Sequence, residues 1–395
     1  MQNYYVLSNG RVKRENNSLV IENTQGDKKP VPVEDVDSLY VYGEVDLNTR
    51  LLNFLTTKHI PLHLFNYYGY YAGSYYPREY LHSGYMLVQQ VNHYSNPEYR
   101  MVLARELVRA AAHSMLRNIA YYANRKEGTV GLPGEDADPT GEIGQDAPAG
   151  PVPPTDEQEE AAVDAVIDAA VSSDPFEERD VFISDLVFDE DPRPLRQLQS
   201  SIVRLAAEID GKPRIDDLMG IEGKMREQYY QAWRHILREG WMFERRVRRP
   251  PDNEVNALIS FGNAVVYTAC LSEIYRTQLA PTISYLHEPG ARRFSLALDL
   301  SEIFKPLIVD RAIFRLINTG QMTPKHFDNS MEGCFLSEAG KRLFLQALEE
   351  RMLATIKHRR LGRHVSYRHL IRLECYKLIR HFAGIEDYRA FRAWW

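Results

Sequence analysis

Two short segments carry the residues best suited to metal or phosphate chemistry. The first is the sequence GIEGK at residues 220–224, in which Glu222 lies between two glycines. Glycine on both sides lets the backbone pack closely, so the carboxylate can be aimed at a metal ion or at a phosphate-bound water. A glutamate in the first turn of a helix explains the same pattern, because it interacts favourably with the helix dipole. The residues alone leave both interpretations open.

The second segment contains a histidine and two acidic residues. His287 ends an apolar run and precedes a Pro-Gly turn, so it can face the mouth of a cleft. Asp299 and Glu302 are three residues apart, which on a helix places both carboxylates on one face. A neutral imidazole with carboxylates suits Mg²⁺ or Mn²⁺. The alternative is a hydrogen-bonded structural histidine beside a helix that Ser295 or Asp299 caps.

Basic residues are concentrated in two places that could follow a phosphate backbone. The sequence FERRVRRPP holds four arginines, and Lys357 to His381 holds eight Lys or Arg against one acid, Glu374. Two tyrosines are interleaved with the second run. Such density favours nucleic-acid contact, because each phosphate contact releases counterions. Solvated helix faces are the ordinary alternative.

The net charge of −6 conceals an uneven distribution along the chain. Residues 127–191 hold 20 Asp or Glu and a single basic residue, Arg179, whereas the remainder holds 47 of the 48 Lys and Arg. This acidic insert is rich in Pro and Gly and poor in aromatics, so it cannot bury enough apolar surface to offset its chain entropy. We predict a disordered, solvated insertion with at most a short helix in EQEEAAVDAVIDAAV; an acidic arm that competes with nucleic acid is the alternative.

Composition excludes several classes of protein. At 395 residues and 44% hydrophobic content, the chain is globular and large enough for a substantial core. Three cysteines without a CxxC pair argue for a reducing compartment and against a zinc ribbon. The start lacks an apolar leader, and the longest uncharged apolar run, Asn256 to Ser272, is too short and polar for a bilayer, which predicts a cytoplasmic protein. No Walker A, GxSxG or HExxH motif is present.

The periodicity predicts an α+β protein, with a small, mostly antiparallel N-terminal β domain followed by a larger all-helical domain. Residues 1–78 show short β-like runs, among them SLVIEN, SLYVYGEV and PLHLFN, with LLNFLTTKHI as one crossing helix. Helical spacing begins at residue 79, with a separate helix over 97–126 after a Pro break. It resumes near residue 195, so the helical domain spans 79–395 and is interrupted by the acidic insert.

Four longer motifs together resemble a known family. They are GIEGKMREQYYQAW, PPDNEVNALISFGNAVVYTAC, ISYLHEPGARRFSLALDLSEIFKPLIVDR and the ending VSYRHLIRLECYKLIRHFAGIEDYRAFRAWW. With the N-terminal YYVLSNGRVKRENNSLVIEN, they resemble the CRISPR-associated integrase of the spacer-acquisition module, the first-numbered Cas protein. The resemblance covers nearly the whole chain outside the acidic insert. It implies a β domain followed by a helical catalytic domain.

The resemblance also implies chemistry and partners. It places a divalent cation, Mg²⁺ or Mn²⁺, on Glu222, His287 and Glu302, with Asp299 as a nearby acid. The reaction would be attack by the 3′-hydroxyl of a short foreign DNA on a phosphodiester at a CRISPR repeat, by a homodimer that works with the small second adaptation protein. Residues near these motifs are expected to grip DNA phosphates, namely Arg245, Arg246, Arg248, Arg292, Arg293 and Lys305. A metal-dependent nuclease of branched DNA and a non-catalytic DNA-binding scaffold are the alternatives.

Overall fold

The N-terminal region consists of two four-stranded sheets. We describe a computed structural model, which covers residues 2–78, 81, 83–126, 194–290, 294–330, 333–358 and 361–393; the acidic insert and the short helix predicted within it lie outside these residues. One sheet has the order β1 (Gln2–Val6), β5 (Val36–Val41), β7 (Leu62–Phe65) and β8 (Tyr71–Tyr75). The other has the order β4 (Lys28–Pro32), β3 (Ser18–Asn23), β2 (Gly10–Glu15) and β6 (Val45–Asp46). Helix α1 (Thr49–Thr57), capped by Asn48, packs beside β2.

This arrangement confirms the β region and its crossing helix but corrects their pairing. The strands were expected to pair mostly antiparallel, yet β1 and β7 both run parallel to β5, and β6 runs parallel to β2. Antiparallel pairing joins β2 to β3, β3 to β4 and β7 to β8. Short strands carry little information about pairing direction, because alternation in sequence is the same for both directions.

Strand β5 shows how the sheet joins the rest of the molecule. Every residue of β5 is buried. Alternation sends Leu39 and Val41 into a core made only of residues 6–62, while Tyr40 points into the core of the helical region. Tyr42, just after the strand, continues that second face and stacks 5.3 Å from Phe261. The sheet is therefore covered on both faces, and one of those covers is the helical body.

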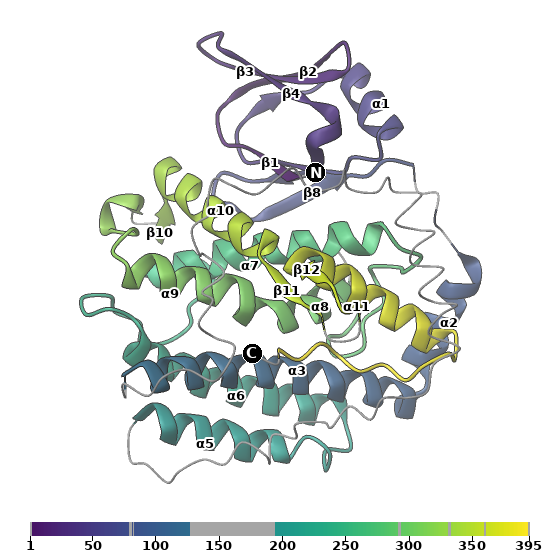
Figure 1. Cartoon of the computed structure of the whole chain (residues 1–395), viewed down its shortest axis with the longest axis vertical. Coiled ribbons are helices and arrows are strands. Elements are labelled where there is room, and N and C mark those ends of the chain that lie inside the picture. Colours follow the sequence, from purple (N-terminus) through teal and green to yellow (C-terminus); the bar gives the residue numbers. More distant parts are fainter. Residues whose placement is uncertain are drawn as a thin grey trace.

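The helical region is layered around one central helix. Its elements are α2 (Gly84–Ser95), α3 (Pro97–Lys126), α5 (Pro194–Ala207), α6 (Ile215–Ile236), α7 (Glu254–Tyr275), α8 (Ser295–Lys305), α9 (Arg311–Asn318), α10 (Glu338–Leu353) and α11 (Tyr367–Phe382). In Figure 1, α3, α5 and α6 form the layer farthest from the sheets, and α7 and α8 lie between that layer and the β region. Two hairpins, β9 (Phe327–Ser330) with β10 (Gly333–Leu336) and β11 (Thr355–Lys357) with β12 (His364–Ser366), show that this region is not entirely helical.

Helix α7 contains the long apolar run of the sequence. The run Asn256 to Ser272 was expected to be too short and polar for a bilayer, but the helix that contains it spans 22 residues and is long and apolar enough, by length and composition, to cross a membrane. However, it is mostly buried inside the fold, where it contacts α8 and α11. A helix that is hydrophobic on all sides and surrounded by other helices is a core helix. Cys270, Cys334 and Cys375 are buried and free.

Buried charges couple the sheet to the helices. Asp37 on β5 accepts from Arg276 at 2.6 Å, Glu273 accepts from Arg372 at 2.7 Å, and Arg368 pairs with Glu349, which also accepts from Tyr5 of β1. We call these six charged residues the interdomain network: Asp37, Glu273, Arg276, Glu349, Arg368 and Arg372. Three acids and three arginines balance one another across the boundary between the two regions.

Candidate functional site

Helix α6 places Glu222 within its interior. The buried face of α6 is formed at helical spacing by Leu218, Ile221, Met225 and Tyr229 among others, so Glu222 lies at the edge of that face and is half-buried. It is the eighth residue of the helix, which excludes the first-turn interpretation. The flanking glycines do not serve close packing either, because a Cβ at Gly220 or Gly223 would meet no atom within 4 Å. They leave open space beside the carboxylate.

Asp299 organises the turn that precedes its own helix. One carboxylate oxygen accepts from the backbone N–H of Tyr285 at 2.7 Å and of Leu286 at 3.0 Å. The other accepts from the backbone N–H of His287 at 3.0 Å and lies 2.8 Å from Nδ1 of its imidazole. Asp299 is fully buried, and four donors surround its two oxygens. It therefore supports His287 and has little capacity left for a metal ion.

The contact with Asp299 selects the tautomer of His287. Asp299 accepts from Nδ1, so the neutral imidazole keeps its proton there and its lone pair on Nε2. Among the described residues, none is hydrogen-bonded to Nε2 of His287. A carboxylate behind the imidazole is the usual support of a metal-binding histidine. His287 thus fits the ligand role, with Asp299 positioning it from behind.

Two carboxylates from different helices converge on one guanidinium. Arg226, one helical turn after Glu222, donates Nε to Glu222 at 2.7 Å and Nη2 to Glu302 of α8 at 2.5 Å. The second oxygen of Glu302 accepts from Lys305 at 2.6 Å. All four side chains are largely buried, with 11–16% exposure. We call Glu222, Glu302, Arg226, Lys305, His287 and Asp299 the site cluster.

The pKa values in the site cluster follow from these contacts. Burial alone would raise the pKa of Glu302, but Lys305 and Arg226 outweigh it and hold that pKa at about 2. Burial alone would lower the pKa of His287, but its hydrogen bond to Asp299 and the charges of Asp299 and Glu302 raise it above the usual value. Asp299, which holds His287, lies one helical turn before Glu302 on α8, so His287 and Glu302 lie near the same stretch of that helix. Glu302 is therefore ionised throughout the physiological range, whereas the raised pKa of His287 means that it keeps its proton to a higher pH than an ordinary histidine.

The donor set matches a hard or borderline cation, although its members do not yet form a metal cage. Glu222 and Glu302 supply carboxylate oxygens, and His287 supplies a neutral ring nitrogen. Among the described residues, no group of three or more His, Cys, Asp or Glu side chains is close enough to hold an ion. The expected convergence of three ligands is replaced by two carboxylates that meet at Arg226. By their chemistry, Glu222, Glu302 and His287 fit a divalent cation. For one ion to be shared by them, the Arg226 side chain must move.

The predicted phosphate-binding residues differ in their surroundings. Arg245 and Arg248 are exposed in the segment between α6 and α7. Arg246 instead donates to Asn256 at 3.0 Å and to Ser260 at 2.8 Å, so it fastens this segment to α7. Lys305 is buried against Glu302. Neither Arg246 nor Lys305 is presented to solvent as a phosphate contact requires, and Arg292 and Arg293 lie outside the described residues.

The C-terminal basic run is largely used for internal pairing. Within α11, Arg368 pairs with Glu349, Arg372 with Glu273, Lys377 with Glu374 and Arg380 with Glu386. A charge count along the sequence does not detect Glu349 and Glu273, because these two acids lie outside the basic run. Four basic residues of the run Lys357 to His381 are therefore paired with acids of the same chain, and the predicted phosphate track along it stays a prediction.

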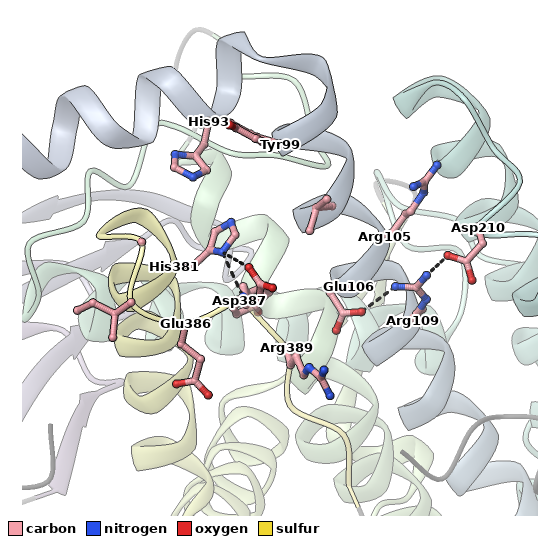
Figure 2. Close-up of a pocket in the computed structure, with 14 residues that line it drawn as sticks. His93, Tyr99, Arg105, Glu106, Arg109, Asp210, His381, Glu386, Asp387 and Arg389 are labelled. Atoms are coloured by element: carbon pink, nitrogen blue, oxygen red, sulfur yellow. Dashed lines mark hydrogen bonds and ion pairs between the residues drawn. The ribbon is translucent and has the colours of Figure 1, made fainter. Parts of the chain in front are cut away.

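A cavity of about 750 Å³ lies between α2, α3 and the segment that follows α11, away from the site cluster. Figure 2 shows charged side chains around it, with Arg109 held between Glu106 and Asp210. His381 lies 4.0 Å from Asp387 on the other side. None of the predicted site residues lines this cavity. Arg109 is paired with two acids there, and Arg105 and Arg389 also line the cavity.

Sequence reasoning missed Arg226. The signal was available, because Arg226 follows Glu222 by four residues and such a pair lies on one face of a helix. What the sequence could not supply is the second carboxylate, Glu302, which is 76 residues away on another helix. A fourth acid near the cluster, Asp310, was also missed; it accepts from Tyr229, and burial raises its pKa to about 7.

Comparison with known sequences identifies close relatives. The family model described as CRISPR associated protein Cas1 matches residues 4–139 and 183–350. A protein of Thermodesulfovibrio yellowstonii named CRISPR-associated endonuclease Cas1 3 is 40% identical over 395 residues, and the alignment covers 100% of both chains.

Comparison with solved structures agrees with the sequences. A Cas1 protein from Thermotoga maritima has a TM-score of 0.74 at 35% identity, covering 98% of this chain and 99% of that one. A casposase bound to integration product has a TM-score of 0.73 at 15% identity, covering 98% and 92%. A Cas6-RT-Cas1–Cas2 complex has a TM-score of 0.70 at 15% identity, covering 99% of this chain and 36% of that one. The last two share the fold alone.

Proposed function

This chain belongs to the family of CRISPR-associated protein Cas1, and we propose that it is a divalent-metal-dependent integrase that joins short foreign DNA to a CRISPR array. The observation that carries the proposal is the site cluster. Glu222 and Glu302 both accept from the guanidinium of Arg226. The imidazole of His287 belongs to the same cluster, and its contact with Asp299 through Nδ1 leaves the Nε2 lone pair available. Relatives of this family carry the name endonuclease, which fits the same chemistry on phosphodiesters.

The proposed reaction is attack of a DNA 3′-hydroxyl on a phosphodiester of the repeat. A new P–O bond joins the two DNAs, the P–O3′ bond of the repeat strand breaks, and that strand leaves with a free 3′-hydroxyl that takes up the proton given up by the attacking hydroxyl. Glu222, Glu302 and Nε2 of His287 would hold Mg²⁺ or Mn²⁺. When bound, the ion lowers the pKa of the attacking hydroxyl and neutralises charge on the phosphate. Asp299 accepts from Nδ1, so it fixes the orientation of the ring and leaves the lone pair of the neutral imidazole on Nε2. Lys305 lies behind Glu302 and keeps that carboxylate ionised.

The chain would act with DNA and protein partners. Arg245 and Arg248 are exposed beyond the end of α6 and are candidates to contact backbone phosphates. We propose a homodimer, and a complex with the small second adaptation protein, Cas2. A known assembly that contains both Cas1 and Cas2 shares the fold, which supports this partnership. The proposed place of action is the cytoplasm, where the array is found.

A joining assay tests the proposal directly. The substrates are a labelled duplex with free 3′-hydroxyls and a supercoiled plasmid that carries a repeat, with Mn²⁺ or Mg²⁺ added. We expect the label to become covalently attached to the plasmid. Glu222→Ala and His287→Ala should abolish joining while salt-sensitive DNA binding stays near normal, because binding depends on arginine and lysine. Full joining by His287→Ala would refute the ligand assignment.

A metal-dependent nuclease of branched DNA is the second candidate. The name endonuclease, given to relatives of this chain, favours it, and hydrolysis differs from joining only in whether water or a 3′-hydroxyl attacks. The same assay separates the two functions. Cleavage of the plasmid or of a branched duplex without attachment of the label would favour the nuclease.

A further inference from the structure

The space between the two site carboxylates is occupied by a positive charge of the protein itself. Arg226 uses two different nitrogens, Nε for Glu222 and Nη2 for Glu302, so one guanidinium spans both helices. Lys305 donates to Oε1 of Glu302, whereas Arg226 donates to Oε2. Within the described residues, Arg226 is the group that ties α6 to α8 through these carboxylates.

A divalent cation and this guanidinium compete for the same oxygens. Mg²⁺ binds its ligand oxygens at roughly 2.0–2.1 Å, so an ion shared by Glu222 and Glu302 must lie between them. The guanidinium occupies that position with two charge-assisted hydrogen bonds, which are about twice as strong as neutral ones. The guanidinium cannot be deprotonated in a protein, so its positive charge stays between the carboxylates as long as the side chain does. Metal entry therefore requires the side chain to swing away.

The competing side chain also has a benefit for the metal-free protein. Two largely buried carboxylates without a counter-charge repel one another and lose hydration. Arg226 compensates both of them at once. Gly220 and Gly223, which flank Glu222 in the sequence, lie on the exposed side of α6 and have open space beside them.

We propose that Arg226 acts as a substitute cation, which holds Glu222 and Glu302 together in the metal-free protein and lowers the affinity for the divalent ion. The proposal rests on the metal dependence proposed above. Arg226 is a positioning residue in this account, because it acts on the reaction through the two carboxylates. It would set the ion concentration at which the site becomes filled.

Binding of Mn²⁺ alone, without DNA, tests the proposal. Free Mn²⁺ is followed by electron paramagnetic resonance during titration of the full chain and of the variant Arg226→Met. We expect the variant to bind Mn²⁺ roughly tenfold to a hundredfold more tightly, because two charge-assisted hydrogen bonds no longer oppose the ion. Its thermal midpoint without metal should fall, and the midpoint gained on adding Mn²⁺ should be larger than in the parent protein.

Two further variants keep the test interpretable. Arg226→Lys retains the charge but cannot bridge both carboxylates, so its Mn²⁺ affinity should lie between those of the parent and of Arg226→Met; it replaces the latter if that variant does not fold. Arg276→Met removes a guanidinium from the interdomain network and should lower the thermal midpoint without changing Mn²⁺ affinity. Equal or weaker Mn²⁺ binding by both Arg226 variants would overturn the proposal.

The outcomes separate this proposal from the proposed function. If the parent binds Mn²⁺ and the Arg226 variants bind it no better, the competition is refuted while the metal site stands. If only the Arg226 variants bind measurably, the competition is supported. If neither the parent nor any variant binds Mn²⁺, both proposals are refuted.

Discussion

The site cluster and the interdomain network are built from the same pairs, arginine with carboxylate, yet they differ in balance and access. The interdomain network sets three acids against three arginines, and Glu273 at its centre has a side-chain exposure of 1%. The site cluster adds an imidazole, and its His287 side chain is 22% exposed. The first links sheet to helices through carboxylates that are at most 14% exposed. In the second, His287 is the member nearest solvent, and exposed glycines of α6 flank Glu222.

The comparison teaches which buried charges can be exchanged. In the interdomain network each carboxylate bonds to arginines that come from other elements, so removing one member leaves an uncompensated charge. In the site cluster the guanidinium of Arg226 bonds to two carboxylates, and Nε2 of His287 is a further potential ligand in the same cluster. An incoming cation can replace the guanidinium there without leaving a carboxylate unpaired. We therefore expect mutations in the site cluster to change joining and Mn²⁺ affinity, and mutations in the interdomain network to change the free energy of unfolding.

The largest expected effect is loss of joining in Glu222→Gln. The variant keeps the shape of the side chain but loses the charge that a metal ligand needs, so joining should fall by about a thousandfold or more. Initial rates with labelled duplex and plasmid measure it. The matched control is Glu227→Gln on the exposed side of α6, which should retain full activity. Equal loss in both variants would contradict the assignment of Glu222.

In the other region, Glu273→Ala should act on stability instead of chemistry. It removes the buried acid that accepts from Arg372, while Arg276 keeps its bond to Asp37, so the free energy of unfolding should fall by about 3 kcal/mol. Denaturant unfolding measures the change. Mn²⁺ affinity of the folded protein should remain unchanged. If Glu273→Ala altered Mn²⁺ affinity with no loss of stability, the separation between the two clusters would fail.

Asp299→Asn should produce an intermediate effect. An amide at this place cannot accept from all four donors, so His287 loses the support that fixes its tautomer. Mn²⁺ affinity should fall by roughly tenfold to a hundredfold. The titration that tests Arg226→Met measures this fall as well. An unchanged affinity would show that His287 needs no partner behind it.

A smaller, graded effect is expected from pH. Because the pKa of His287 is raised, protonation begins at higher pH than for an ordinary histidine and blocks Nε2. Joining should be complete above that pKa and fall about tenfold for each pH unit below it. Glu302, with a pKa of about 2, stays ionised and does not contribute to this fall. A pH–rate profile that stays flat down to about pH 5.5 would contradict the ligand role of His287.

The smallest effect is expected from the exposed arginines. Arg245→Ala and Arg248→Ala should each weaken DNA binding a few-fold and lower the slope of affinity against salt by about one. The parallel variant Arg246→Ala should instead lower stability, because that side chain is bonded to α7. Filter binding at several salt concentrations distinguishes the two behaviours.

Much of the fold followed from local pattern. The helix over 97–126 was predicted with both boundaries correct, because Pro97 and a long apolar period mark it. The parallel pairing of β1 with β5 was not predicted, since the two strands are joined by long-range hydrogen bonds that leave no trace in local sequence. The same limit applies to α11, because the acidic partners of Arg368 and Arg372 lie outside the basic run and leave no trace in its local sequence.

The candidate site was predictable to the level of residue types. Glu222, His287 and Glu302 stand in motifs of the family, and Asp299 was expected nearby. Its four donors became visible only once the turn at Tyr285–His287 was folded over α8. Arg226 was missed for a similar reason, because its second partner belongs to another helix.

The central claim is that one divalent cation is shared by Glu222, His287 and Glu302. A crystal grown with Mn²⁺ and measured for anomalous scattering addresses it without any assay of activity. The account predicts a single strong peak between the two carboxylates and Nε2 of His287, with the guanidinium of Arg226 turned away. A protein saturated with Mn²⁺ that shows no peak there, and Arg226 still bridging both carboxylates, would contradict it.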